Sequence, residues 1–469
     1  MITYIKINGF KSFQNFEMTF TPLTVVAGVN ASGKSNLFDA LKLLSRLAET
    51  DLKTAFADQR GNPRELFTQY DGFNHYASEM SFEVEMLVNR QIKDNWGADT
   101  ELNSTRLRYI LTIARKPNDL GIDDVTVKYE HLEKIKKEDD TWSKTILPKT
   151  AKDLWKTIRA GGSKKPFIQT ETTNSITTIK IRQDGRQGGK ATPADSVSQT
   201  VLGGINSIDF PHAYAVKEEM RSWKFLQLNP EDLRTPTRKD IGLRDVITPS
   251  GKNMAAALYR IKKTDAYTLI EISRKLNTFL PECIDVNVYD DDVNQQFIIR
   301  VKGEDGKEFS SRVLSEGTLR LLALCILEHD PQHTGLICFE EPENGIHPFR
   351  ITAMAQLLKD LTADFTDTKA PLRQVIVNTH SPTLVSKLIE WKNDPQVGVW
   401  LSRLHSLIMP IENANKIKIK ITKMSPVTKK KEHQLLLFPI PEHEQKLTLD
   451  EVINYLKTAD TEKAKEAIQ

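Results

Sequence analysis

The chain has 469 residues, with 65 Lys and Arg against 62 Asp and Glu, so its formal net charge is only +3. This length allows about two to four domains and a sizeable core, while so small a charge does not by itself identify a nucleic-acid binder. The longest apolar run, Leu321–Leu327, is far shorter than the roughly 20 residues that cross a bilayer. The three cysteines show no Cys-x-x-Cys spacing, and the first residues lack the apolar stretch of a signal peptide. We therefore expect a cytoplasmic protein with no disulfide framework, no structural zinc and no membrane partner.

The first chemical signal is a glycine-rich loop between a strand and a helix. Leu23–Ala27 is a short β-branched apolar run that predicts a buried strand, and Asn36–Leu47 has the apolar spacing of a helix. The loop between them, Gly28-Val-Asn-Ala-Ser-Gly-Lys-Ser35, has the G-x-x-x-x-G-K-S pattern of a phosphate loop. A glycine-rich turn with a chance Lys-Ser pair is the alternative, and the flanking strand and helix argue against it.

Such a loop predicts nucleotide binding. Backbone N–H groups and the helix N-terminus would bind the phosphates, Lys34 would reach the β and γ oxygens, and the Ser35 hydroxyl would be a ligand of Mg²⁺. The expected cofactors are therefore ATP and Mg²⁺. The expected nucleotide contacts in the loop are Gly28, Asn30, Ser32, Gly33, Lys34, Ser35 and Asn36.

The middle of the chain gives a coarser pattern. Met80–Val88 and Arg106–Ile113 alternate like strands, and Trp223–Leu228 also resembles a strand. Asn253–Lys262 has helical spacing after a glycine turn. These patterns indicate a mixed α/β chain.

A second anchor follows near residue 340. The apolar run Leu336–Phe339 predicts a strand that ends in Glu340 and Glu341. One carboxylate at such a position can lie beside Mg²⁺ while the other orients or deprotonates the attacking water. We assign the metal side to Glu340 and the base to Glu341. Two solvated carboxylates at a strand end are the alternative, and the motif Asn344-Gly-Ile-His-Pro348 directly afterwards argues against it.

These motifs, in this order, resemble the SMC, RecF and OLD group of ABC ATPases. Within that group the chain is similar to the single-headed ATPase subunits of bacterial anti-phage systems such as Septu. The resemblance covers roughly the first 90 residues and the stretch from about 205 to 405. The segments that carry it are Ile5–Phe13, Gly28–Ser35, Ser315–Arg320, Glu340–Pro348 and Thr379–Pro382.

The resemblance implies a P-loop NTPase of α/β class with an ABC-type head, and it gives roles to further residues. Ser315 and Gly317 stand at the signature positions, so they would contact the γ-phosphate held by Lys34 of a second copy in a head-to-head dimer or higher oligomer. His380, which follows the predicted strand Gln374–Asn378, would touch the γ-phosphate. Gln69 is the candidate for the glutamine loop and would be a metal ligand. Glu340 stands where Asp is commoner in the group.

The interval between Ser35 and Leu314 is much longer than the helical subdomain of a transporter's ATP-binding component, so the head contains an insertion. We expect four segments. They are 1–90 for the N-terminal part of the head, 91–205 for an inserted α+β region, 206–405 for the lid and the remaining motifs, and 406–469 for a C-terminal extension.

Basic residues cluster in two places. Lys416, Lys418 and Lys420 alternate with isoleucines, so a strand would present them on one face, and Lys429–Lys431 follows. The second cluster is the loop Arg182–Lys190, with Arg159, Lys164 and Lys165 preceding it. A solvated edge strand guarded by lysines and a surface loop are the alternatives; a groove for double-stranded DNA is the functional interpretation.

The C-terminal part bears on partners. Leu447–Lys457 has the pattern of a capped amphipathic helix, which would pack on its own head or dock a nuclease. The segment after His380 is too short for the fused TOPRIM domain of OLD-type nucleases and contains no Asp-x-Asp motif. Nuclease chemistry would therefore come from a separate subunit of HNH or TOPRIM type.

The sequence thus predicts an ATPase with composite sites that regulates a separate nuclease in anti-phage defence. A RecF-like repair or replication ATPase, which clamps DNA without a nuclease partner, is the alternative. A transporter component is a third possibility, and the long insertion argues against it.

Overall fold

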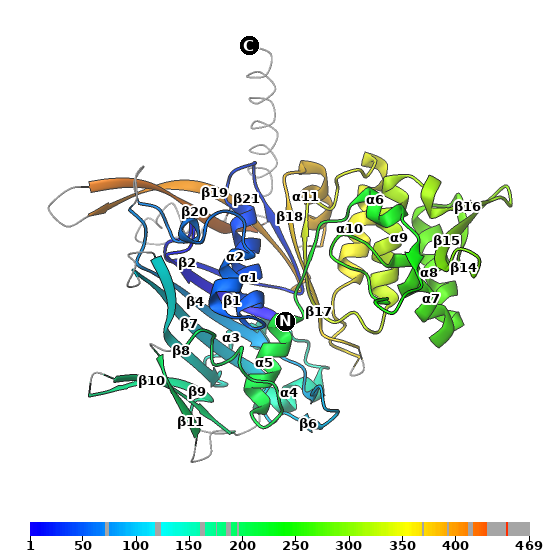
Figure 1. Cartoon of the computed structure of the whole chain (residues 1–469). Coiled ribbons are helices and arrows are strands. Elements are labelled where there is room, and N and C mark those ends of the chain that lie inside the picture. Colours follow the sequence, from blue (N-terminus) through cyan, green and yellow to red (C-terminus); the bar gives the residue numbers. More distant parts are fainter. Residues whose placement is uncertain are drawn as a thin grey trace, which may run out of the picture.

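The computed structural model describes residues 1–70, 75–117, 123–159, 165–174, 176–183, 189–194, 197–367, 370–391, 394–410, 416–428 and 447–448. Two large sheets lie on either side of a helical layer, and a lid of helices with a small sheet of its own lies beside them (Figure 1). None of the helices in the described ranges combines the length and the apolarity needed to cross a bilayer.

A seven-stranded sheet forms the centre of the molecule. In spatial order it contains β12 (Lys224–Leu226), β17 (Gly335–Glu340), β18 (Arg373–Thr379), β3 (Leu23–Ala27), β19 (Val397–Pro410), β20 (Lys416–Thr428) and β21 (Leu447–Thr448). Neighbours from β12 to β19 run parallel, so their carboxyl ends share one edge. The strands predicted at Leu23–Ala27, Leu336–Phe339 and Gln374–Asn378 are confirmed, and the one at Trp223–Leu228 is shorter than expected.

The central sheet is buried on both faces, which explains its unbroken apolar runs. In β17, Leu336 and Cys338 pack toward α1 (Lys34–Leu47), while Ile337 and Phe339 pack toward the lid side. The helices on that side are α9 (Glu316–His329), α10 (Ile351–Asp360) and α11 (Pro382–Ile389). The phosphate loop connects this buried sheet, at the end of β3, to the helix α1 that packs on it.

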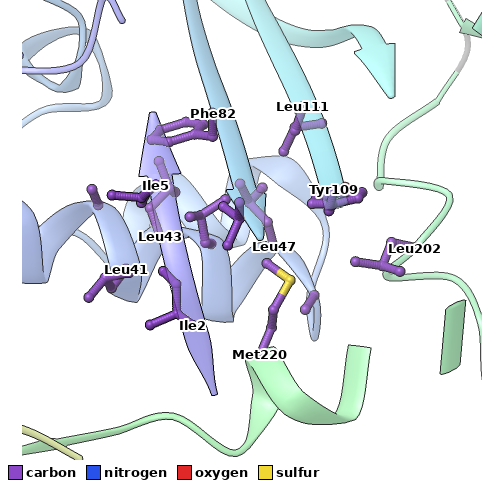
Figure 2. Packing of buried hydrophobic residues seen from close by; sticks show 14 of the residues in the cluster. Ile2, Ile5, Leu41, Leu43, Leu47, Phe82, Tyr109, Leu111, Leu202 and Met220 are labelled. Carbon is purple, nitrogen blue, oxygen red and sulfur yellow. The ribbon is translucent and has the colours of Figure 1, made fainter. Parts of the chain in front are cut away.

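An antiparallel sheet covers the other side of α1. Its eight strands, in order, are β11 (Gly189–Pro193), β10 (Ile176–Arg182), β9 (Ile168–Thr173), β8 (Asp123–Lys134), β7 (Arg106–Pro117), β4 (Glu79–Leu87), β1 (Ile2–Asn8) and β2 (Phe16–Thr19). Ile5, Phe82 and Leu111 of this sheet pack near Leu43 and Leu47 of α1 (Figure 2). This sheet runs across residue 90, where the sequence placed a segment boundary.

Smaller elements complete this half of the molecule. They are α2 (Leu52–Ala57), η1 (Pro63–Leu66), β5 (Gln91–Lys93), β6 (Asp99–Glu101), α3 (Thr141–Ile146), α4 (Lys152–Arg159) and α5 (Pro211–Arg221).

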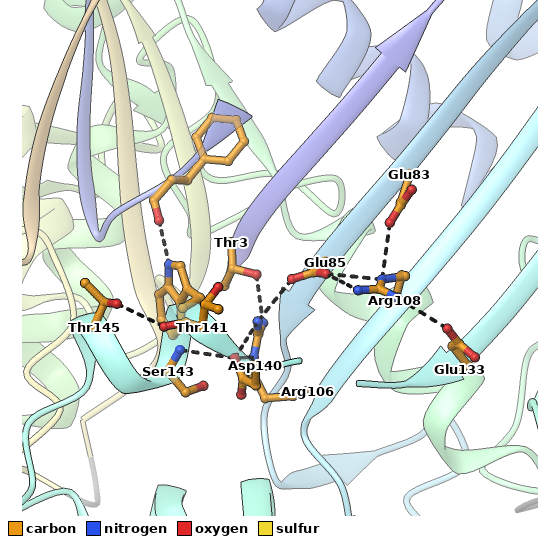
Figure 3. Close-up of polar contacts among 12 residues, drawn as sticks. Thr3, Glu83, Glu85, Arg106, Arg108, Glu133, Asp140, Thr141, Ser143 and Thr145 are labelled. Atoms are coloured by element: carbon orange, nitrogen blue, oxygen red, sulfur yellow. Dashed lines mark hydrogen bonds and ion pairs between the residues drawn. The ribbon is translucent and has the colours of Figure 1, made fainter. Parts of the chain in front are cut away.

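The charged stretch before α3 contributes a carboxylate to a buried ion pair. Arg106, only 1% exposed, pairs with Asp140 at 3.1 Å and donates to Thr3 Oγ1 at 2.7 Å (Figure 3). Burial by itself would raise the pKa of Asp140, but the Arg106 guanidinium holds it below its usual value.

The lid follows β12. Besides α9, α10 and α11 it contains α6 (Pro230–Arg234), α7 (Met254–Thr264), α8 (Ala266–Phe279), β13 (Thr237–Arg238), β14 (Cys283–Asp291), β15 (Gln296–Gly303), β16 (Glu308–Ser310), η3 (Ser311–Val313) and η4 (Pro348–Arg350). The helix predicted at Asn253–Lys262 is α7. Buried residues on all sides of α9 place it inside the lid core.

The C-terminal prediction is wrong at its start. Leu447 and Thr448, expected to begin a helix, form β21 and pair with Val427 and Thr428 of β20. Strand pairing at the open edge of β20 satisfies backbone groups that a local capping pattern cannot anticipate. The rest of that predicted helix and Lys429–Lys431 lie outside the described residues.

Candidate nucleotide-binding site

The candidate site lies at the carboxyl edge of the parallel sheet. Thr379 at the end of β18 pairs with Ala27 of β3, and Glu340 of β17 pairs with Asn378, so three motifs leave neighbouring strand ends. A cavity of about 550 Å³ opens there. Its lining consists of Asn30, Ala31, Gly33, Lys34, Ser35, Asn36, Gln227, Leu228, Arg320, Glu340, Glu341, Asn344 and Asn378.

The phosphate loop brings the N-terminus of α1 to this cavity. Gly33 is the N-cap with φ 92° and has no side chain to cap the helix, so the N–H groups of the first turn remain for an anion. Lys34 Nζ donates to the carbonyl oxygens of Gly28 at 2.6 Å and Val29 at 2.9 Å, which holds the ammonium inside the loop. Charge and donors therefore converge as a phosphate group requires.

The loop also has support from behind. A Cβ on Gly33 would lie 1.8 Å from Thr422 Oγ1 of β20, so glycine is needed here for packing as well as for its positive φ. The carbonyl oxygen of Ser32 accepts hydrogen bonds from Ser402 Oγ at 2.9 Å and Thr422 Oγ1 at 3.3 Å. The Ser32 hydroxyl is buried and has no hydrogen-bond partner in the part of the chain that the structure describes.

Glu341 is held in one orientation by its neighbours. Its φ of 45° is rare for a residue with a side chain, and its N–H donates to Asn378 O at 3.0 Å. Its carboxylate lies 2.9 Å from His380 Nδ1 and accepts from Asn344 Nδ2 at 2.8 Å. The Glu341 side chain is 33% exposed, so water reaches it.

The neighbouring carboxylates have different surroundings. Glu340 lines the cavity, and its Oε1 lies 3.8 Å from Arg60 Nη2. Glu343 accepts a hydrogen bond from Thr379 Oγ1, and burial raises the pKa of its carboxyl group. Because Thr379 Oγ1 also accepts from Ser381 N at 2.9 Å, this contact shapes the turn that carries His380.

The signature residues lie on the lid and outside the cavity lining. Ser315 caps α9, and its Oγ accepts from Thr318 N at 3.2 Å. A Cβ on Gly317 would lie 3.2 Å from Gly345 O, so the signature turn packs on the loop after Glu341. Beside these turns, Val313 and Phe349 are 70% and 91% exposed.

The structure brings together most, but not all, of the residues expected at the site. Asn30, Gly33, Lys34, Ser35, Asn36, Glu340 and Glu341 line the cavity, while Gly28 and Ser32 support the loop and His380 reaches the site through Glu341. Gln69 is not brought there; it is exposed and forms an isolated bridge with Tyr76. We therefore do not retain Gln69 as a metal ligand.

Gln227 occupies the cavity instead. It follows β12, whose parallel pairing with β17 puts its carboxyl end at the same edge. The signal was the strand break at Asn229-Pro230, which marks Gln227 as a strand-end residue. Sequence reasoning also missed Arg320, which lines the cavity and donates to Leu228 O at 3.1 Å.

The donor set fits ATP with Mg²⁺. Among the residues that the structure describes, no three His, Cys, Asp or Glu side chains come together to hold a metal ion. Mg²⁺ at phosphate-transfer sites typically takes one or two protein ligands and completes its shell with phosphate and water oxygens. The Ser35 hydroxyl and the Glu340 carboxylate, both in the cavity lining, are ligands of that kind.

The sequence of the chain matches one known protein family. A sequence model of one family, described as "AAA domain, putative AbiEii toxin, Type IV TA system", matches residues 23–386, more than half of the chain. No curated protein matches.

The solved structures that resemble the chain include SMC heads. One is an SMC head bound to the C-terminal winged-helix domain of ScpA (13% identity, TM-score 0.47, covering 90% of this chain and 98% of that one). Another is the SMC head domain from Thermotoga maritima (13%, 0.36, 91% and 99%). A third is an SMC head with an extended coiled coil, bound to the C-terminal domain of ScpA, derived from Pyrococcus furiosus (13%, 0.42, 91% and 96%).

The expected α/β fold is confirmed, with the phosphate loop and the paired carboxylates at the edge of a parallel sheet. The chain belongs to the family described as "AAA domain, putative AbiEii toxin, Type IV TA system".

Proposed function

We propose that this protein is a Mg²⁺-dependent ATPase whose two copies complete each other's sites. The observation that carries the proposal is the convergence of the α1 N-terminus, Lys34, Ser35, Glu340 and Glu341 on one cavity. Phosphoryl transfer to water requires anchored phosphates, a neutralising cation and an oriented nucleophile, and these residues can supply all three.

Each residue has a separate task in this proposal. The loop N–H groups and Lys34 bind the phosphates, and Ser35 with Glu340 holds the cation, which neutralises charge on the phosphate oxygens. Glu341 orients water and accepts its proton, a role typically worth about 10²- to 10⁴-fold in rate. His380 and Asn344 keep the Glu341 carboxylate in place through contacts of 2.9 and 2.8 Å. Gln227 is proposed as the glutamine-loop residue in place of Gln69.

The composite site is proposed from the position of the signature turn. Ser315 and Gly317 do not line the cavity of their own chain, and Val313 and Phe349 beside them expose apolar surface. Exposed apolar side chains at such a place favour a partner that covers them. A second copy related by a two-fold axis would bury both and bring its Ser315 to Lys34.

Double-stranded DNA is the proposed macromolecular ligand. Lys418 and Lys420 are exposed on one face of β20, as the alternation predicted, while Ile419 and Ile421 on the other face are buried. The second basic cluster offers less support, because Arg182 is already engaged by Glu171 at 3.0 Å. We therefore place the DNA contact on the β19–β20 hairpin.

At the level of the system, we propose that nucleotide state regulates a separate nuclease of HNH or TOPRIM type in anti-phage defence. The family description as a putative toxin of type IV toxin–antitoxin systems supports a role in a multi-component system. The rival is a RecF-like ATPase that clamps DNA alone, and the hairpin lysines favour it equally. Copurification of the native operon followed by mass measurement separates the two, because only the first predicts a bound nuclease.

The experiment that tests the activity is phosphate release from ATP with Mg²⁺ and with excess chelator, beside direct ATP binding. The unmodified protein should turn over only with Mg²⁺, and Lys34→Ala should lose ATP binding and turnover together. Lys42→Ala, on the same helix but outside the cavity lining, is the matched control and should bind normally. Turnover by Lys34→Ala at the unmodified rate would contradict the proposal.

A further inference from the structure

The β19–β20 hairpin has one face that runs from solvent to the phosphate loop. The register pairs Ile408 with Lys418, Ser406 with Lys420 and Leu404 with Thr422, and paired residues in antiparallel strands share a face. Outward along the hairpin this face carries the exposed Lys418 and Lys420. Figure 1 shows the hairpin, in orange, extending beyond the rest of its sheet.

Inward, the same face contacts the loop through buried hydroxyl groups. Thr422, 1% exposed, places its Oγ1 2.6 Å from Ser12 Oγ and 3.3 Å from Ser32 O. Ser402, two positions before Leu404, donates to the same carbonyl at 2.9 Å. Asn36 Nδ2, at the cavity, donates to Ser12 Oγ at 2.7 Å.

These contacts form a directed chain of hydrogen bonds. Asn36 can only donate its amide hydrogen, so Ser12 accepts it, donates to Thr422, and Thr422 donates to the carbonyl of Ser32. The chain starts at Asn36 on α1 and ends at Ser32 in the phosphate loop, and one of the two residues between them, Thr422, belongs to the hairpin. Buried networks of this kind have few alternative arrangements because each unpaired member is costly.

The hairpin and the phosphate loop pack closely against each other, without room for an added side chain at Gly33 or Gly28. A Cβ on Gly33 would lie 1.8 Å from Thr422 Oγ1, and one on Gly28 would lie 2.7 Å from Ser402 O. Lys420 is two residues from Thr422, about 7 Å along the strand. A change in the twist of the hairpin at Lys420 therefore has to pass along only two residues of strand to reach Thr422, which packs against Gly33.

We propose that the hairpin couples duplex DNA bound along Lys418 and Lys420 to the phosphate loop, with Thr422 as the positioning residue, so that DNA tightens ATP binding. This inference rests on the proposed ATP and DNA sites. An isolated two-stranded ribbon is marginally stable and free to twist. Bound DNA that fixes the hairpin would already have ordered it, so less conformational entropy would be lost when ATP binds.

The test measures ATP affinity with and without a mixed-sequence duplex of about two helical turns, in a Glu341→Gln background so that turnover does not interfere. DNA should raise ATP affinity by a coupling factor of roughly 5- to 150-fold, and ATP should raise DNA affinity by the same factor because linkage is reciprocal. Thr422→Val keeps the shape but loses the hydroxyl group. It should bring the factor close to one while DNA affinity without nucleotide stays unchanged.

Two further variants complete the design. Ser402→Ala removes the parallel bond to Ser32 and should reduce the coupling factor even if Thr422→Val fails to fold. Lys423→Gln is the control, because its register partner Arg403 places it on the opposite face, and it should leave the coupling factor unchanged.

The outcomes separate the inference from the function on which it rests. DNA affinity unaffected by Lys418→Gln with Lys420→Gln would remove the proposed DNA surface. DNA that binds through these lysines with a coupling factor of one in the unmodified protein, or with an unchanged factor in both Thr422→Val and Ser402→Ala, would overturn the coupling while leaving the DNA site in place.

Discussion

Nδ1 of His380 lies 2.9 Å from Oε1 of Glu341, and the two residues follow neighbouring parallel strands. Because an ionised carboxylate only accepts hydrogen bonds, Nδ1 carries the proton in this contact. Asn344 donates to Oε2 at 2.8 Å, so each oxygen of Glu341 is held by one donor and keeps acceptor capacity for water. A positioned base is the function that this arrangement fits.

Glu341→Gln should retain ATP binding and lose turnover by on the order of 10²-fold or more, because the amide has nearly the same shape but accepts no proton. Bound, unhydrolysed ATP should then hold the closed dimer. Phosphate release and mass measurement in ATP check both effects. Glu390→Gln, an exposed carboxylate at the end of α11, is the control and should behave like the unmodified protein. Native turnover in Glu341→Gln would assign the base elsewhere.

Phe349→Ser should weaken the ATP-dependent dimer without weakening the fold. The side chain is 91% exposed in one copy, so its loss costs the isolated chain little. If a two-fold contact buries it twice, at about 1.5–3 kcal/mol each, the dimer dissociation constant should rise by about 10²-fold or more. Sedimentation with ATP in the Glu341→Gln background measures this effect. Ile176→Ser, an exposed apolar residue of β10, is the matched control.

DNA binding should depend steeply on salt and only weakly on sequence, because phosphate contacts position without specifying. Replacing Lys418 and Lys420 by Gln should flatten the log–log salt slope by about 1.8 units, near 0.9 for each neutralised phosphate. ATP turnover without DNA should change little. Lys423→Gln removes one such charge from the other face of β20 and should leave the slope as it was. An unchanged slope in the double variant would mean that these lysines do not contact DNA phosphates and instead prevent unwanted pairing at an edge strand.

Glu130 should make stability depend on pH. It is fully buried, and burial raises its pKa from 4.5 to about 6, although hydrogen bonds from Leu202, Val201 and Tyr109 oppose the rise. A carboxyl group with a raised pKa in the folded state stabilises the fold below its unfolded pKa and loses that contribution as pH rises through 6. The free energy of unfolding, relative to Glu130→Gln, should therefore fall by on the order of 2 kcal/mol between pH 4.5 and pH 7.

Urea unfolding of both proteins across this range measures the difference and subtracts the other titrating groups. A difference that stays constant with pH would mean that Glu130 titrates alike in the folded and unfolded chains.

The sequence patterns predicted those elements whose structure depends on residues close together in the chain. The strands at Leu23–Ala27 and before Glu340 are apolar runs followed by glycine or carboxylates, and the helix that follows Gly33 has the apolar spacing of an amphipathic helix. Their place in the site therefore follows from the order of residues. The sequence could not show which of Gln69 and Gln227 lies at the site, because only the pairing of β12 with β17 puts Gln227 at the cavity. Likewise, Thr422 contacts Ser32 across 390 positions, and no periodicity encodes that contact. The start predicted for the last helix failed for the same reason, since β21 depends on pairing with β20.

The most direct test of the composite site is complementation between two inactive proteins. Ser315→Arg and Lys34→Ala should each fail to hydrolyse ATP alone. In a mixed dimer, the intact Lys34 of one copy would meet the intact Ser315 of the other, while the second site would carry both defects.

A one-to-one mixture should recover about a quarter of the unmodified rate, because about half of the dimers are mixed and each mixed dimer has one intact site out of two. Native mass measurement on the same samples verifies that mixed dimers form. Activity of Ser315→Arg alone, or no recovery in a mixture shown to contain mixed dimers, would contradict an ATP site shared between two chains.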